Sequence, residues 1–193
     1  MELGCGTGQL SFALLDSFQS CIGVDPAEGM IEVLAEKIGE SGESARMSAV
    51  CANLLEGPPP AELTPAGYDL IFSKLAWHHI PDRSGMVSAC APLLAPGGRL
   101  LILDIEDTPT NNSRHFHTPE MTVGVEYESD GISEADVRQW FADAGYTEVE
   151  IERTQFEQKT HPGWVEQGAP EISEFTMMLA SAVATPAAAA AKL

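Results

Sequence analysis

The residues Glu2-Leu3-Gly4-Cys5-Gly6-Thr7-Gly8, followed by the apolar segment Gln9 to Phe18, decide the fold of this 193-residue chain. Three glycines at alternate positions, between a carboxylate and a helix-like segment, predict a strand that turns sharply into a helix. Glycine adopts positive φ and lets a ligand lie against the backbone, and the free N–H groups of the next helix point at that ligand. A second apolar run ends at Asp25, where a doubly wound sheet presents an acid to a ribose diol.

The glycine spacing separates two classes of cofactor. The dinucleotide fingerprint is G-x-G-x-x-G, and its third glycine would stand at position 9, which is Gln9. The pattern present here is E-x-G-x-G-x-G. A NAD-dependent oxidoreductase is therefore the less favoured alternative, although it uses a similar sheet.

Composition excludes several classes of partner. The net charge of −19 and the pI near 4.4 argue against nucleic acid and against an anionic membrane surface, because both are bound through basic patches. The four cysteines have no CxxC spacing, so neither a metal site nor a disulfide framework is expected. No signal peptide or long apolar span is present, which predicts a cytoplasmic protein.

Strand-like and helix-like segments alternate along the first half of the chain, which predicts a parallel sheet with helices on both faces. Two final strand-like segments, 148–158 and 172–183, have no helix between them and should pair antiparallel. The expected fold is a doubly wound, mostly parallel α/β sheet in three layers (α/β/α), forming one domain over residues 1–183. Predicted helices cover residues 9–18, about 30–39, 83–94 and 133–145, and predicted strands cover 21–24, 47–51, 68–73 and 99–105.

Two polar or low-complexity stretches interrupt this pattern. Residues 107–131 are polar and irregular, a long insertion of the kind that tends to be functional. The alanine-rich tail, 184–193, is expected to be flexible. Its last three residues, Ala191-Lys192-Leu193, are similar to the peroxisomal tripeptide S-K-L, so a peroxisomal location is the alternative.

Four segments together resemble class I S-adenosylmethionine (SAM)-dependent methyltransferases over nearly the whole chain. They are the glycine turn, the acid at Asp25, Tyr68 to Ser73 followed by Trp77-His78-His79-Ile80, and Leu93 to Leu100 with its Pro-Gly-Gly. The resemblance implies a seven-stranded sheet whose last strand is antiparallel. Only Met1 to Leu3 precede the glycine turn, so the resemblance also implies a first strand shortened at its N-terminus.

By this resemblance the methionine end of SAM is held by Glu2 and by backbone at Gly4, Cys5, Gly6 and Gly8. Asp25 binds the ribose hydroxyls and Pro26 packs beside the adenine. Asn53 stands where the family often has an acid near the adenine amine, and it keeps an acceptor oxygen.

Ser73 and Leu75 flank the sulfonium and methyl group by the same resemblance. Lys74, between them, replaces a frequent asparagine. Because a lysine opposes a sulfonium electrostatically, Lys74 should point away or reach an acid of the substrate.

A catalytic base is needed only if the acceptor must lose a proton, and histidine suits that task near neutral pH. The candidates are His78 and His79, then His115 and His117 in the polar insertion. The alternative for His78 and His79 is structural, with one buried and the other bracing a helix.

Three acids, Asp104, Glu106 and Asp107, end the most apolar strand. They could bind a metal or a cationic substrate, but solvated acids are expected, since a metal cluster would need further ligands. In some methyltransferases that resemble this chain, such acids recur with a Phe-His pair, here Phe116-His117, so the resemblance implies that the insertion 107–131 is a lid over the acceptor. No metal is predicted.

The predicted function is SAM-dependent methyl transfer to a small-molecule acceptor. A non-catalytic SAM-binding or scaffold protein is the alternative to the enzyme, ahead of the NAD-dependent oxidoreductase.

Overall fold

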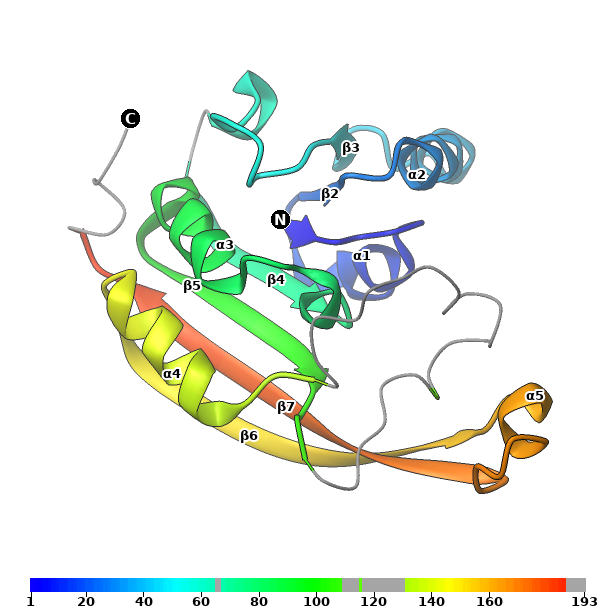
Figure 1. Cartoon of the computed structure of the whole chain (residues 1–193). Helices are drawn as coiled ribbons and strands as arrows, with labels where there is room; N and C mark the ends of the chain where they lie inside the picture. Colours follow the sequence, from blue (N-terminus) through cyan, green and yellow to red (C-terminus); the bar gives the residue numbers. More distant parts are fainter. Residues whose placement is uncertain (65–66, 109–114, 116–130, 187–193) are drawn as a thin grey trace.

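The computed structural model describes residues 1–64, 67–108, 115 and 131–186. These residues form one seven-stranded sheet, with helices on both of its faces (Figure 1). The strand order is β3-β2-β1-β4-β5-β7-β6. The first five of these strands are parallel, β7 is antiparallel to β5, and β6 is antiparallel to β7. The predicted doubly wound sheet with its antiparallel last strand is confirmed.

The strands are β1 (Glu2–Leu3), β2 (Cys21–Asp25), β3 (Met47–Cys51), β4 (Tyr68–Lys74), β5 (Leu94–Ile105), β6 (Tyr146–Lys159) and β7 (Ile172–Ala184). The α-helices are α1 (Gln9–Leu14), α2 (Glu28–Ser41), α3 (Arg83–Cys90), α4 (Glu134–Asp143) and α5 (Pro162–Val165). Short 3₁₀ turns cover Leu15–Ser17, Ala61–Leu63, Trp77–His79 and Ala91–Leu93. Among the described residues, no helix is long and apolar enough to cross a membrane.

Each face of the sheet packs against its own pair of helices. Side chains alternate between the two faces of a strand, so neighbouring residues of β4 enter different cores: Ile71 packs with Val87 and Phe141 under α3 and α4. Phe72 packs instead with Leu34 and Ile38 of α2. The sheet, with a core and a layer of helices on each face, forms the three predicted layers.

The structure departs from the sequence prediction at several element boundaries and in one added helix. α2 continues past Gly39 to Ser41 and ends at Gly42, which adopts the left-handed conformation (φ 78°). β5 begins at Leu94 because Pro96-Gly97-Gly98 forms a bulge inside the strand, seen as a register shift opposite Tyr68 and Leu70. A short helix, α5, lies at the tip of the β6–β7 hairpin, which extends beyond the other strands (Figure 1).

The start of α4 follows its sequence signature. Ser133 is the N-cap, and its Oγ accepts a hydrogen bond from the backbone N–H of Asp136 at 3.1 Å. The same hydroxyl donates to the Asp136 carboxylate at 2.7 Å. This exchange satisfies an orphan donor of the first turn.

Candidate cofactor and active site

A cleft of about 570 Å³ lies at the carboxyl ends of β1 and β4. In the sheet, β1 stands between β2 and β4, so the chain crosses in opposite directions on its two sides. Open α/β sheets bind ligands at such a switch point. The lining residues come from the glycine turn, α1, α2 and the end of β4: Glu2, Gly4, Cys5, Gly6, Thr7, Gln9, Leu10, Ala13, Met30, Lys74 and Leu75.

The glycine turn needs glycine at both of its ends. Gly4 has φ 67° and Gly8 has φ 78°, a region that residues with a side chain rarely adopt. A Cβ on Gly4 would stand 2.5 Å from Cβ of Ala76, and one on Gly8 would stand 2.3 Å from Cδ1 of Leu34. The turn can therefore pack closely on α2 and on the loop after β4.

Asp25 holds the turn in place from the end of β2. Its carboxylate accepts hydrogen bonds from the backbone N–H of Gly6 at 2.8 Å and of Ala27 at 2.9 Å. The carboxylate thus links the glycine turn to the start of α2, and its remaining lone pairs are available to a ligand.

Glu2 is a buried acid at the floor of the cleft. The residue is 3% exposed, and one carboxylate oxygen accepts a hydrogen bond from the hydroxyl of Ser11, which is fully buried in α1. Burial raises the pKa of Glu2 because desolvation disfavours the charged form. A cationic ligand group in the cleft would offset that cost.

The end of β4 supplies the opposite wall. Lys74 and Leu75 line the cleft, and Leu75 has φ 56°, unusual for a residue with a branched side chain. The Leu75 N–H donates to Leu103 O at 2.8 Å, which fixes this bend against β5. Ser73 lies beneath, 1% exposed, with its Oγ 3.9 Å from where a Cβ on Gly4 would stand.

Pro26 and Asn53 lie farther along the same sheet edge. Pro26 is exposed directly after β2, and Ala52 N donates to Asp25 O at 3.1 Å, which brings the end of β3 beside it. Asn53 is engaged within its own turn, where its Oδ1 accepts from Leu55 N and its Nδ2 donates to Glu56. The structure brings both residues to the predicted edge, and neither lines the 570 Å³ cleft.

These residues fit S-adenosylmethionine. A Cβ on Gly6 would meet no atom within 4 Å, so the backbone there is open to a ligand. Within the described residues, the buried Ser73 Oγ has no hydrogen-bond partner, a cost that a nearby ligand can remove. Glu2 offers a negative charge where the ligand is a cation, and Asp25 offers carboxylate oxygens.

The protein-family comparison agrees with this geometry. Residues 1–100, which contain the glycine turn, Asp25 and β4, match the family model described as a methyltransferase domain. The chain belongs to the class I SAM-dependent methyltransferases. The NAD-dependent alternative is set aside by this match.

Several curated relatives of this chain carry the name ubiquinone biosynthesis O-methyltransferase, and another, of Schizosaccharomyces pombe, is named an uncharacterized methyltransferase. The chain is 32% identical over 152 residues to a ubiquinone biosynthesis O-methyltransferase of Xylella fastidiosa, a match covering 75% of the chain and 59% of that relative. It is also 32% identical to the ubiquinone biosynthesis O-methyltransferase of Idiomarina loihiensis, a match that covers 52% of the chain and 39% of that relative. The chain therefore matches less than two thirds of the length of these curated relatives.

Solved structures share the fold at low identity. A phosphoethanolamine N-methyltransferase of Haemonchus contortus, in complex with S-adenosylhomocysteine, superposes with a TM-score of 0.71 at 20% identity, covering 95% of this chain and 48% of that one. The [4+2]-cyclase SpnF superposes with a TM-score of 0.65 at 15% identity, covering 95% and 73%. Such likeness establishes the fold alone, because one fold hosts several chemistries.

The two adjacent histidines of the methyltransferase have different environments. His78 is 1% exposed, and its Nδ1 lies 2.7 Å from Oδ1 of Asp104, which is fully buried. His79 is exposed, and its ring centroid lies 4.0 Å from that of His78. The arrangement matches the structural alternative for His78 and leaves His79 as the accessible member of the pair.

The remaining candidate histidines belong to the polar insertion. His115 Nδ1 lies 3.1 Å from Ser173 Oγ on β7, and burial lowers the pKa of His115. Its ring centroid is 6.0 Å from that of Trp164 in α5, so His115 lies on the β6–β7 hairpin. His117 lies outside the described residues, as do most of 107–131 and the tripeptide Ala191-Lys192-Leu193.

The expectation that the strand-ending acids are all solvated is wrong for two of them. Asp104 accepts from Trp77 N at 2.7 Å, His78 N at 3.2 Å and Ile105 N at 2.7 Å, besides the His78 ring. It therefore clamps the loop after β4 onto β5. Asp107 is exposed, as expected.

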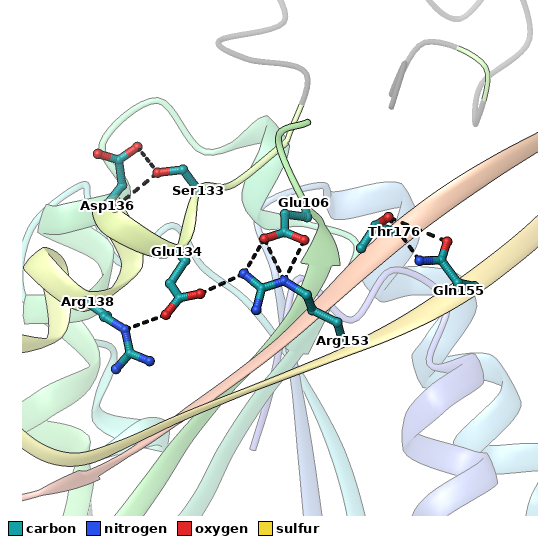
Figure 2. Close-up of polar contacts among 8 residues, drawn as sticks. All are labelled: Glu106, Ser133, Glu134, Asp136, Arg138, Arg153, Gln155 and Thr176. Atoms are coloured by element: carbon teal, nitrogen blue, oxygen red, sulfur yellow. Dashed lines mark hydrogen bonds and ion pairs between the residues drawn. The ribbon is translucent and has the colours of Figure 1, made fainter. Parts of the chain in front are cut away.

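Glu106 is the second strand-ending acid that is buried, with 8% of its surface exposed. Figure 2 shows it facing Arg153 of β6. Arg153 donates from Nε and Nη2 to the carboxylate at 2.6 to 2.9 Å, and from Nη2 to Glu134 at 2.7 Å. Glu134 also accepts from Arg138 at 2.7 Å. No group of three or more acids, histidines or cysteines in the described ranges could hold a metal.

Proposed function

We propose that this chain transfers the methyl group of S-adenosylmethionine to a small-molecule acceptor. The observation that carries the proposal is the cleft at the switch point, where a buried acid, an open glycine backbone and the end of β4 converge. The family match over residues 1–100 supports the cofactor. The names of the curated relatives support a small acceptor with an attacking oxygen.

Each element of the cleft and of the adjoining sheet edge has one task in this proposal. Glu2 and the turn from Gly4 to Gly8, including the backbone of Cys5 and Gly6, hold the methionine end. Asp25 accepts from the ribose hydroxyls while it keeps the turn attached to α2. Pro26 and Asn53 flank the adenine at the ends of β2 and β3.

The end of β4 positions the reacting groups. The cofactor supplies a sulfonium whose methyl carbon is activated for attack by a nucleophile. Ser73 and Leu75 border that position, and the bend at Leu75 is held by its hydrogen bond to Leu103. Positioning of two reactants in line accounts for much of the rate of such a displacement.

An acceptor hydroxyl must lose its proton, and His79 is the described histidine best placed to take it. It is exposed and follows the bend after β4, whereas His78 is committed to Asp104. An exposed histidine side chain can accept a proton from an acceptor hydroxyl in its reach. His117 is retained as the second candidate from the sequence.

Isothermal titration calorimetry with S-adenosylhomocysteine, SAM and NADH tests the cofactor assignment. We expect saturable binding of both sulfur ligands and none of NADH. Asp25→Ala should weaken binding at least about tenfold, since it removes a charged acceptor. Asp69→Ala is the matched control, because Asp69 is an exposed acid at the opposite end of β4.

Methyl transfer is then measured with labelled SAM and a panel of phenols, carboxylic acids and amines. Turnover that falls in His79→Gln but not in His161→Gln supports the base. Binding of SAM without turnover on any acceptor would favour the non-catalytic alternative. A folded protein that binds neither sulfur ligand would overturn the proposal.

A further inference from the structure

Lys74 is the cationic side chain in the cofactor cleft. It is the last residue of β4 and lines the cleft together with Glu2. The sequence left two alternatives for it, pointing away or reaching an acid of the substrate. Its position in the wall of the cleft argues against the first.

Strand register brings Lys74 and Glu2 to one face of the sheet. Glu2 of β1 pairs with Phe72 of β4 in a parallel ladder. Because side chains alternate along a strand, Lys74, two residues beyond Phe72, points to the same face as Phe72 and Glu2. This is the face covered by α1 and α2, whose residues Leu10 and Met30 complete the cleft.

The cleft therefore presents one negative and one positive side chain. Cys5, the other ionisable group in the lining, stays a neutral thiol because burial raises its pKa to about 12. The rest of the lining is backbone, amide, hydroxyl or apolar. A pair of opposite charges about a small cleft is complementary to a zwitterion, such as a free amino-acid group.

Lys74 also differs from most of the other cations that the structure describes, although exposed Lys159 likewise has no ion-pair partner. Arg46, Arg138 and Arg153 form salt bridges with glutamates, and Lys37 donates to the carbonyl of Thr7. Within the described part of the chain, Lys74 has neither kind of partner. It does interact electrostatically with Glu2, but no hydrogen bond or close ion pair among the described residues holds its ammonium, which can therefore contact a ligand.

We propose that Lys74 binds the carboxylate of the cofactor's amino-acid end, while Glu2 faces the α-ammonium. The inference rests on the proposed function and assigns one more residue to the same site. The carboxylate is the one anionic group of SAM, and pairing with it draws the lysine charge away from the sulfonium. An acidic group on the acceptor is the competing partner, and the test separates the two.

The test compares two ligands that differ in the amino-acid end. S-adenosylhomocysteine has both the ammonium and the carboxylate, whereas 5′-methylthioadenosine has the same nucleoside and thioether without them. Dissociation constants are measured by calorimetry for the parent chain, Lys74→Met, Lys74→Arg and Lys159→Met. Lys159 is an exposed lysine on β6, so its variant controls for the loss of one positive charge.

We expect Lys74→Met to weaken S-adenosylhomocysteine about fivefold, as for a partly exposed ion pair, and to leave methylthioadenosine unchanged. Lys74→Arg should retain the affinity, and Lys159→Met should have no effect. Higher salt should reduce the difference, because exposed charges are screened.

Equal affinity of Lys74→Met and the parent for S-adenosylhomocysteine would overturn the inference and point to the acceptor's acid instead. A loss of both ligands in parallel would also overturn it, since the lysine would then support the cleft as a whole. Failure of the parent chain to bind either ligand would contradict the proposed function itself, which keeps the two failures distinct.

Discussion

The glycine turn after β1 and the acids at the end of β5 lie on the same edge of the sheet but are stabilised in different ways. The turn is held by backbone conformation and by one acid, Asp25, 19 residues from its partner Gly6. The buried acids Asp104 and Glu106 instead pair with side chains that are distant in the sequence. His78 is 26 residues from Asp104, and Arg153 is 47 residues from Glu106. The first region is the proposed cofactor site, and the second fixes the loop and helix beside it.

The glycine turn is encoded by adjacent residues, whereas the contacts of the buried acids depend on how the strands are arranged in the sheet. A glycine at positive φ is a requirement of the backbone, so the sequence displays it. A buried acid acquires its partner only when β4, β5 and β6 come together. Substitutions in the two regions should therefore have different consequences, with the largest loss of stability at the end of β5.

Asp104→Ala should cause the largest loss of stability. It leaves the N–H groups of Trp77, His78 and Ile105 and the His78 ring without their acceptor in a fully buried place. Removing one partner of a buried charged network costs about 3–5 kcal/mol. Urea denaturation followed by circular dichroism measures the free energy of unfolding.

Asp107→Ala is the matched control, because this exposed acid stands three residues further along. It should change stability by less than about 0.5 kcal/mol. Similar effects of the two variants would contradict the clamp assigned to Asp104.

Gly8→Ala should give the next largest effect, in stability and in ligand binding together. The new Cβ would stand 2.3 Å from Leu34 at φ 78°, and overpacking with a strained backbone costs about 2–3 kcal/mol. Titration with S-adenosylhomocysteine should show a loss of affinity in the folded fraction.

Gly39→Ala is the contrasting glycine variant. Gly39 lies inside α2 with no atom within 4 Å of an added Cβ, so alanine should stabilise the chain by about 0.5–1 kcal/mol. A destabilising Gly39→Ala, or a neutral Gly8→Ala, would break the distinction between a required and a replaceable glycine.

The sequence predicted the sheet, its antiparallel last strand, the glycine turn and the N-cap at Ser133 because each depends on periodicity or on a few adjacent residues. It could not tell His78 from His79, since the 3₁₀ turn that buries one and exposes the other depends on Asp104 in β5. It did not place Lys74 in the cleft, because that follows from the register of β1 against β4. Arg153 carried no local signal at all.

Glu2→Gln should separate stability from binding at the glycine turn. Burial raises the pKa of Glu2 above the usual 4.5, so the folded state holds the proton more tightly than the unfolded state. Stability therefore falls as pH rises from 4.5 through the folded pKa. At pH 7 the neutral glutamine should stabilise the chain on the order of 1 kcal/mol, while S-adenosylhomocysteine binds more weakly.

Thermal unfolding of both proteins between pH 4 and 8 measures this difference. The difference in melting temperature between Glu2→Gln and the parent should increase with pH and be smallest near pH 4. A Glu2→Gln variant that is less stable at pH 7 would show that the hydrogen bond from Ser11 outweighs desolvation of the carboxylate.

Glu134→Gln should have the smallest effect and the opposite dependence on pH. Hydrogen bonds from Arg153 and then Arg138 hold the pKa of Glu134 below 4.5, so its contribution is present above that value and is lost as pH falls through the folded pKa. The variant should melt slightly below the parent at pH 7, and the two melting temperatures should converge at lower pH. Glu157→Gln, at an exposed acid of β6, should follow the parent at every pH. A pH-independent difference for Glu134→Gln would mean that the pair with Arg153 acts through packing, and the charge network in Figure 2 would then matter less than the buried clamp at Asp104.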